Sequence, residues 1–247
     1  MVQSLGQSRP SRIDAREARV GDMPAYLAKP AESENPPILI VVAEIFGIND
    51  HIRDVVRRFA TEGYLAIAPD FFFRVGDPSK ETDIAAIRSI IMKVPDAEAM
   101  HDFDAALAFA ASLGGDATRT AITGFCWGGR MAWLYAAHNP KLRAAVPWYG
   151  RLDGERTKNQ PHWPIDVADR LAVAYLGLYG GGDPSIPLPL VEEMRARLRA
   201  APAQGEIVVY PDAPHAFFAD YRESYREEAA RDAFARMLAF LKAQGVA

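Results

Sequence analysis

Residues 124–128 read Gly-Phe-Cys-Trp-Gly, the pattern of a nucleophile elbow with cysteine in the position that serine usually takes. In such an elbow a strand turns sharply into a helix, and flanking glycines allow a close backbone approach. The dipole of the following helix stabilises a thiolate at Cys126, and a thiolate attacks carbonyl carbons. The pattern alone is weak, because a lone cysteine is more often a small buried hydrophobic residue.

Three further residues that can do acid–base chemistry, Glu44, Asp183 and His215, each follow an apolar run with the composition of a strand. The chain order Cys126, Asp183, His215 is that of the α/β-hydrolases. A histidine exchanges protons near neutral pH, and a carboxylate holds its tautomer. Asp183 alone would be an ordinary turn residue and His215 alone a core histidine. Their joint placement with Cys126 favours a Cys-His-Asp triad.

Two backbone N–H groups are candidates for an oxyanion hole. Trp127 directly follows the nucleophile, and Ile45 begins the loop after the first buried strand. Glu44, at the end of that strand, is costly to bury without a partner. It is interpreted either as half of a structural salt bridge with an arginine or as a partly buried carboxylate close to the thiol. Of the remaining histidines, interpreted as structural or surface residues, only His51 lies close to Glu44 in sequence.

Apolar periodicity alternates between strands and helices along the chain, which predicts a mostly parallel central sheet with helices on both faces. In such sheets the active site lies beyond the carboxyl ends of the strands. We therefore expect residues 1–247 to form a single domain with the α/β-hydrolase fold, with a hairpin at about 12–29 and a C-terminal helix at about 224–243. Further strands are expected at 36–44, 64–72, 119–125, 142–150, 173–181 and 205–211. Helices are expected at 50–63, with Asp50 as the N-cap and Gly63 as the stop, at 127–139 and 186–201 and over most of 77–113, and an irregular loop is expected at 151–170.

The composition is that of an ordinary globular protein, with 49% hydrophobic and 24% charged residues. A net charge of -4 without a basic run gives little support to nucleic-acid binding. No apolar stretch approaches the roughly 18 residues of a membrane helix, and the start lacks a secretory signal, so we expect a cytoplasmic protein with no membrane partner. The five histidines and one cysteine show no metal-ligand spacing.

Five motifs, in order VVAEIFGIND, GYLAIAPDFF, GFCWGGR, GGDPSIP and PHAFF, resemble those of the dienelactone hydrolase (carboxymethylenebutenolidase) family. The resemblance runs from about Arg16 into the C-terminal helix. It implies an α/β-hydrolase fold with Cys126 as the nucleophile, His215 as the base and Asp183 as its orienting acid. It also implies that no metal or organic cofactor is needed.

The resemblance carries over to the other candidates. It implies that Ile45 and Trp127 supply the oxyanion N–H groups. Glu44 matches a glutamate that contacts the resting thiol and takes its proton once substrate has moved it, so that the thiol stays unreactive until then.

The chain departs from the family at the substrate-binding positions. The family arginine four residues after the histidine is replaced by Ala219, with Arg222 three residues further on. Arg74 falls near the family's other carboxylate-binding arginine. Trp148 and Tyr149 either line the pocket or pack at the end of a core strand.

We therefore expect a cysteine-dependent hydrolase of lactones or activated esters that forms a covalent thioester. Its partner would be a small-molecule ester or lactone, and the protein would be a monomer or small homo-oligomer. Two alternatives stay open: a broad carboxylesterase or thioesterase that does not act on dienelactone, and a non-catalytic binding protein on the same fold.

Overall fold

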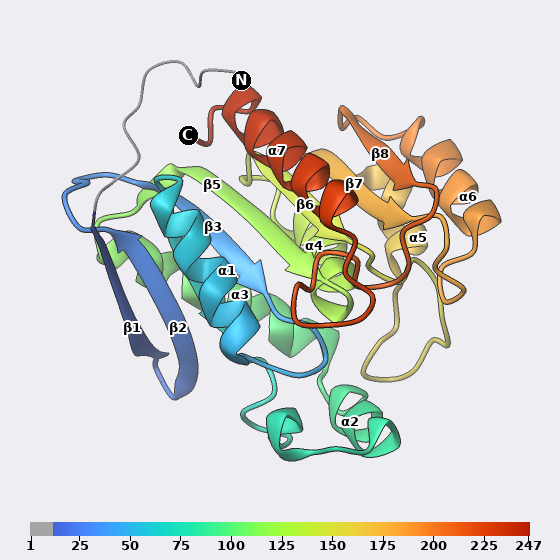
Figure 1. The fold of residues 1–247 in the computed structure, drawn as a ribbon, viewed down its shortest axis with the longest axis horizontal. Coiled ribbons are helices and arrows are strands. Elements are labelled where there is room, and N and C mark those ends of the chain that lie inside the picture. The colour runs from blue at the N-terminus through green and yellow to red at the C-terminus, as the bar shows by residue number, and fades with distance from the viewer. Residues whose placement is uncertain (1–11) are drawn as a thin grey trace.

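The computed structural model describes residues 12–247, and its centre is an eight-stranded sheet (Figure 1). The strand order is β1-β2-β4-β3-β5-β6-β7-β8, in which β3 to β8 are parallel and the β1–β2 hairpin joins antiparallel to β4. The predicted mostly parallel α/β sheet is confirmed. The strands are β1 (Ile13–Val20), β2 (Met23–Pro30), β3 (Pro37–Val42), β4 (Leu65–Pro69), β5 (Asp116–Phe125), β6 (Ala144–Trp148), β7 (Ala174–Gly180) and β8 (Gly205–Tyr210).

Helices cover both faces of the sheet. In Figure 1, α1 and α7 lie in front of it and α3 and α4 behind it. Helix α1 packs on β2 and β4, and α4 packs on β5 and β6. The helices are α1 (Asp50–Thr61), α2 (Ile84–Ile91), α3 (Asp96–Ser112), α4 (Trp127–His138), α5 (Pro164–Val167), α6 (Leu188–Leu198) and α7 (Glu227–Ala243), with short 3-10 turns η1 (Pro78–Lys80) and η2 (Ala168–Arg170).

Some local features differ from the sequence prediction. Helix α1 is capped by Asn49, whose side chain accepts a hydrogen bond from the N–H of Ile52 at 3.0 Å. Helix α7 begins at Glu227, because Arg226 has an extended backbone (φ -128°, ψ 99°), and its N–H donates to the carbonyl of Phe217. The segment expected to be an irregular loop at 151–170 contains α5 and η2.

The strand register brings the candidate residues to one edge of the sheet. Val42 at the end of β3 pairs with Gly124 near the end of β5, so the segments carrying Glu44 and Cys126 leave the sheet side by side. Gly180 likewise pairs with Tyr210 at the ends of β7 and β8. Strands β3, β4, β6 and β7 and the last six residues of β5 are almost entirely buried. This burial fixes the register, because a slip would expose their apolar side chains.

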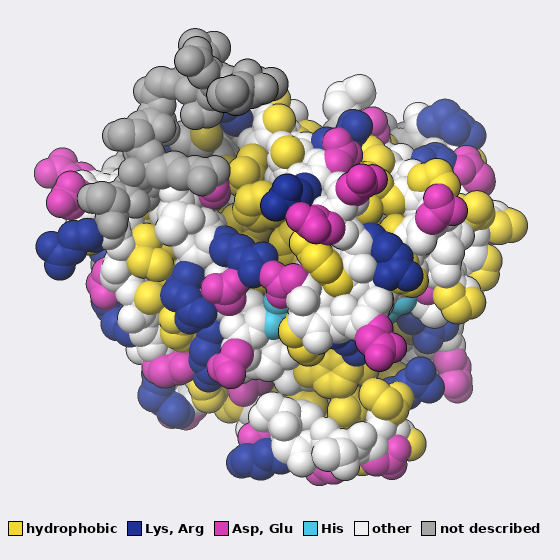
Figure 2. Space-filling view, viewed as in Figure 1, with side chains coloured by type: hydrophobic (Ala, Val, Ile, Leu, Met, Phe, Trp, Pro, Cys, Tyr) yellow, Lys and Arg dark blue, Asp and Glu magenta, His cyan; other side chains and the backbone are white. Residues whose placement is uncertain are grey.

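The surface in Figure 2 shows Lys and Arg intermixed with Asp and Glu over the near face. That face therefore has no extended single-sign region of the kind that binds polyanions. None of the helices within residues 12–247 is long and apolar enough to cross a membrane.

The crossing of β3, β5 and α4 leaves no room for a side chain at its two glycines. A Cβ atom at Gly124 would collide with the backbone of Gly128, and one at Gly128 would collide with the carbonyl oxygens of Val42 and Ala43. The turn at Cys126 is thereby held against the end of β3.

We predict that Gly128→Ala lowers the free energy of unfolding by about 2 kcal/mol or more, because the colliding atoms are backbone and cannot rotate away. Denaturant unfolding measures the change. The matched control is Cys126→Ala in the same turn, which adds no atom and should cost less. Equal stability of Gly128→Ala and the wild type would show that the packing is not tight.

Candidate active site

Cys126 lies on a strained turn between β5 and α4. Its φ of 55° and ψ of -113° are unfavourable for a residue with a side chain. Its N–H donates to the carbonyl of Trp148 at 3.1 Å, which fixes the turn to the end of β6. The residue is partly exposed and stands directly before the first turn of α4. This is the geometry expected of a nucleophile elbow.

His215 and Asp183 are joined by a short hydrogen bond. His215 Nδ1 lies 2.6 Å from Asp183 Oδ2, and the other carboxylate oxygen accepts from the N–H and hydroxyl of Ser185 at 2.8 and 2.6 Å. Burial raises the pKa of Asp183, but its bonds to His215 and Ser185 outweigh burial and hold the pKa below its usual range. Asp183 is therefore an ionised acceptor that fixes the ring of His215.

The histidine ring also interacts with the sulfur. Burial lowers the pKa of His215, but the hydrogen bonds to Asp183 and to Cys126 outweigh it and raise the pKa to about 10. The ring of His215 thus interacts with both the carboxylate of Asp183 and the sulfur of Cys126. The structure thus brings Cys126, His215 and Asp183 together.

Three residues other than glycine have a positive φ within the described part of the chain: Cys126 (55°), Tyr149 (36°) and Ala216 (59°). All three lie at the candidate site, since Tyr149 packs on the ring of His215 and Ala216 follows His215 in the chain. Backbone strain of this kind persists only where surrounding contacts enforce it, and it is typical of functional sites.

Two backbone N–H groups near the thiol are left without an acceptor. Within residues 12–247, neither the N–H of Ile45 nor that of Trp127 donates a hydrogen bond. Ile45 follows β3, and Trp127 opens α4 beside Cys126. Both groups are available to bind an oxyanion.

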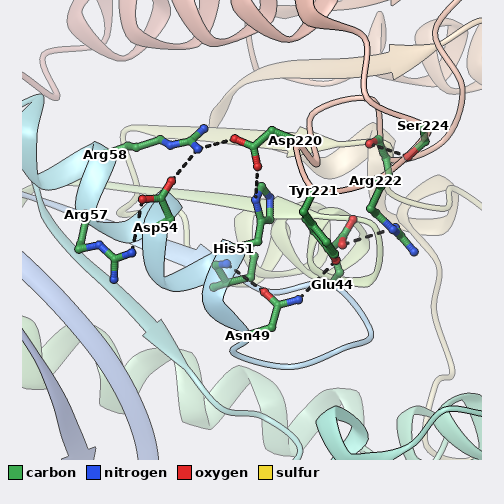
Figure 3. A network of polar contacts seen from close by, with 12 residues as sticks. Glu44, Asn49, His51, Asp54, Arg57, Arg58, Asp220, Tyr221, Arg222 and Ser224 are labelled. Atoms are coloured by element: carbon green, nitrogen blue, oxygen red, sulfur yellow. Dashed lines mark hydrogen bonds and ion pairs between the residues drawn. The ribbon is translucent and has the colours of Figure 1, made fainter.

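Glu44 is buried beside the guanidinium of Arg222, and the charge of His215 also acts on it. Arg222 Nη1 lies 3.7 Å from Glu44 Oε2, and neither carboxylate oxygen has a hydrogen bond from the described residues (Figure 3). Burial raises the pKa of Glu44, and the charges of Arg222 and His215 and the nearby Tyr221 hydroxyl only partly offset this. Glu44 and Cys126 are therefore not hydrogen-bonded here, and the carboxylate faces Arg222 instead.

The two aromatic candidates have different surroundings. Trp148 is fully buried, and its indole N–H donates to Thr123 Oγ1 at 3.1 Å, so it packs in the core. Tyr149 stands edge-on to the ring of His215 at 5.1 Å between centroids, and its buried hydroxyl has no partner among the described residues. Burial, with the nearby Glu44 and Cys126, raises the pKa of Tyr149 well above its ordinary value. Tyr149 therefore contacts the triad through His215, whereas Trp148 packs in the core next to it.

Arg74 is paired with carboxylates of α3. Its guanidinium forms two hydrogen bonds with Asp102, at 2.7 and 2.9 Å, and lies 3.7 Å from Glu98. These two carboxylates belong to α3 and neutralise the cation. Arg222 is the arginine that the structure places beside Glu44, even though it stands three residues beyond the expected position at Ala219.

Sequence reasoning missed Tyr221, which lies between Asn49 and Glu44 in Figure 3. The side-chain amide of Asn49 donates to its hydroxyl at 3.4 Å. Its only signal in the sequence was its place next to Arg222.

The sheet topology, the strained turn and the residues around it define an α/β-hydrolase. Residues 23–245 match the model of the dienelactone hydrolase family. The chain belongs to this family, whose members are hydrolases acting on ester or lactone bonds.

Individual relatives agree with this assignment. The chain is 55% identical over 226 residues to a protein of Escherichia coli (strain K12) provisionally named a carboxymethylenebutenolidase, covering 91% of this chain and 83% of that protein. It is 33% identical over 223 residues to a Bradyrhizobium protein provisionally named a 2-oxo-3-(5-oxofuran-2-ylidene)propanoate lactonase, with 88% of each covered. The crystal structure of a provisionally named dienelactone hydrolase from Klebsiella pneumoniae superposes with a TM-score of 0.92 at 55% identity, covering 94% of this chain and 99% of that one.

We predict that Asp183→Asn lowers the pKa of His215 from its raised value of about 10, because the neutral amide no longer stabilises the imidazolium. The ring signals of His215 in an NMR pH titration report the change. Ser185→Ala is the control, since it removes a bond to Asp183 and keeps the charge. An unchanged His215 titration in Asp183→Asn would contradict the assigned role of Asp183.

Proposed function

We propose that this protein hydrolyses lactones or activated esters through a covalent thioester on Cys126. The observation that carries the proposal is the placement of a strained, partly exposed thiol beside an Asp183-bound His215, together with two N–H groups that have no acceptor among the described residues. Each feature supports one part of acyl transfer.

Acylation begins when the sulfur of Cys126, its proton held by His215, attacks the carbonyl carbon. The carbonyl electron pair moves to oxygen, and the N–H groups of Ile45 and Trp127 bind the resulting oxyanion. When the intermediate collapses, the carbon–oxygen bond to the leaving group breaks. His215 returns its proton to the departing alkoxide or enolate, which leaves a thioester and a neutral imidazole.

Deacylation reverses these roles. Neutral His215 takes a proton from water as the oxygen attacks the thioester carbon, and Asp183 stabilises the imidazolium that forms. The carbon–sulfur bond then breaks, which restores the thiolate–imidazolium pair and releases the acid. A thiolate is best suited to esters with a good leaving group, and the enolate of an unsaturated lactone is one.

Glu44 and Arg222 form a second pair for which we propose a control function. The family resemblance implies a second route to the thiolate, in which Glu44 instead of His215 takes the thiol proton after substrate has moved the carboxylate. The 3.7 Å pairing of Glu44 with Arg222, without a hydrogen bond to the carboxylate, supports a carboxylate that is held loosely enough to move. A substrate carboxylate that takes Arg222 would release Glu44.

The proposed substrate is therefore an anionic lactone or ester. The name of the Bradyrhizobium relative describes such a compound, a lactone with a propanoate group. Ala219 leaves the usual arginine position without charge, which favours the alternative of a broad carboxylesterase or thioesterase, but Arg222 supplies a cation from a neighbouring turn. Tyr149 and Arg222 are the proposed substrate contacts; Arg74, which pairs with Asp102, and Trp148, which packs in the core, are given no substrate contact in this proposal.

We predict that Cys126→Ala reduces kcat/KM on para-nitrophenyl acetate and on cis-dienelactone by at least about a hundredfold, because no nucleophile remains. Release of nitrophenolate and loss of dienelactone absorbance measure the two reactions. Trp148→Phe, in the core behind the site, is the matched control and should keep most activity. Undiminished turnover in Cys126→Ala would exclude Cys126 as the nucleophile, and no turnover by the wild type would favour the binding-protein alternative.

A further inference from the structure

Arg222 stands on a loop between His215 and α7 that is fastened to α1 by one carboxylate, Asp220 (Figure 3). Asp220 Oδ1 lies 3.0 Å from His51 Nδ1, and Asp220 Oδ2 pairs with Arg58. Both partners belong to α1, two helical turns apart. The carboxylate therefore ties the backbone just before Arg222 to a rigid helix at two points.

The contact between Asp220 and α1 is buried on the side of His51. The side chain of His51 is 5% exposed, and burial lowers its pKa although Asp220 acts against this. Burial raises the pKa of Asp220, but the bonds and charges of Arg58 and His51 outweigh it, and the pKa lies below its usual range. Asp220 is therefore ionised: it accepts a hydrogen bond from the Nδ1–H of His51 and forms an ion pair with Arg58.

The next two residues of the loop also contact the segment that carries Glu44. The ring of Tyr221 lies 5.0 Å from that of His51, and the guanidinium of Arg222 lies 4.9 Å from the ring of Phe46. Three consecutive loop residues therefore dock onto the segment from Glu44 to α1. An arginine side chain has many rotamers, so its position over Glu44 depends on where this backbone is held.

A second carboxylate beside Arg58 provides a matched control for Asp220. Asp54, also on α1, pairs with Arg58 at 2.6 Å and lies 3.4 Å from Arg57. Asp54 thus shares the partner Arg58 with Asp220, but within residues 12–247 its own ion pairs stay within α1. Removing its charge changes the same arginine without releasing the loop.

We propose that Asp220, held by His51 and Arg58, is the positioning residue that keeps Arg222 over Glu44 and thereby sets the preference for anionic over neutral esters. This inference rests on the proposed function, in which Arg222 receives a substrate carboxylate. It assigns the preference to a residue that touches neither the substrate nor the thiol.

The test is a double-mutant cycle of Asp220→Asn and Arg222→Gln, with mono-para-nitrophenyl succinate and para-nitrophenyl butyrate as the anionic and neutral substrates. We expect Asp220→Asn to raise KM for the succinate about tenfold and to change KM for the butyrate little, with kcat for the butyrate retained. In the Arg222→Gln background the same change should have no further effect on the KM ratio, because the guanidinium that it positions is gone. Asp54→Asn should leave the ratio at its wild-type value.

Several results would overturn the proposal. The first is that Asp220→Asn changes the ratio of the two KM values equally with and without Arg222. The second is that Asp54→Asn changes this ratio as much as Asp220→Asn does. The third is that Arg222→Gln leaves the ratio unchanged. If Asp220→Asn does not fold, His51→Phe tests the same tie, because it keeps a ring beside Tyr221 and removes the Nδ1–H.

A crystal structure of Asp220→Asn separates this inference from the proposed function, because it needs no turnover. Movement of the Arg222 guanidinium away from Glu44 would support the positioning role even if neither ester were hydrolysed. A guanidinium that stays 3.7 Å from Glu44 would contradict the role even in a fully active enzyme.

Discussion

The close contact of three backbone segments at Cys126 is the constraint on which the site depends. Glycines at 124 and 128 let β5 and the start of α4 press against the end of β3, and the chain between them has no relaxed conformation available. The N–H of Trp127, which opens α4 directly after the turn, has no acceptor within residues 12–247. The strain costs stability locally, and the buried parallel strands on either side supply the packing that offsets it.

The two buried carboxylates Asp183 and Glu44 have pKa values shifted in opposite directions because their partners differ. Asp183 receives hydrogen bonds from His215 and Ser185, so its charge is stabilised and its position is fixed. Glu44 is equally buried, but neither carboxylate oxygen has a hydrogen-bond partner among the described residues, and its ion-pair partner is a guanidinium at 3.7 Å. Environments that push two carboxyl pKa values apart are typical of sites in which one group orients and the other exchanges a proton.

Much of this arrangement could be predicted from the sequence, because strand composition and chain order are local properties. The elbow motif placed Cys126, and the rule that parallel strands end at one edge placed Asp183 and His215 beside it. The partners of arginines were not predictable in this way. Arg74 is neutralised by Asp102 of α3, and Arg222 reaches Glu44 through a loop with no regular period.

The role of His51 shows the same limit. Its closeness to Glu44 in sequence drew attention to it. His51 is connected to the site through Asp220, however, which is 169 residues away in the chain. Contacts of this length depend on how loops pack once the sheet has formed. The N-cap of α1 was missed for a related reason. Asn49 and Asp50 are both good capping residues, and backbone geometry decides between them.

The central claim is that Cys126 carries the acyl group during turnover. The most direct test is acid quenching during hydrolysis of para-nitrophenyl butyrate, followed by mass spectrometry of the intact protein and of its peptides. We expect a butyryl adduct on the peptide that contains Cys126, which is lost on treatment with hydroxylamine, as thioesters are. Turnover without an adduct on Cys126, or an adduct on another residue that turns over at the catalytic rate, would contradict the claim.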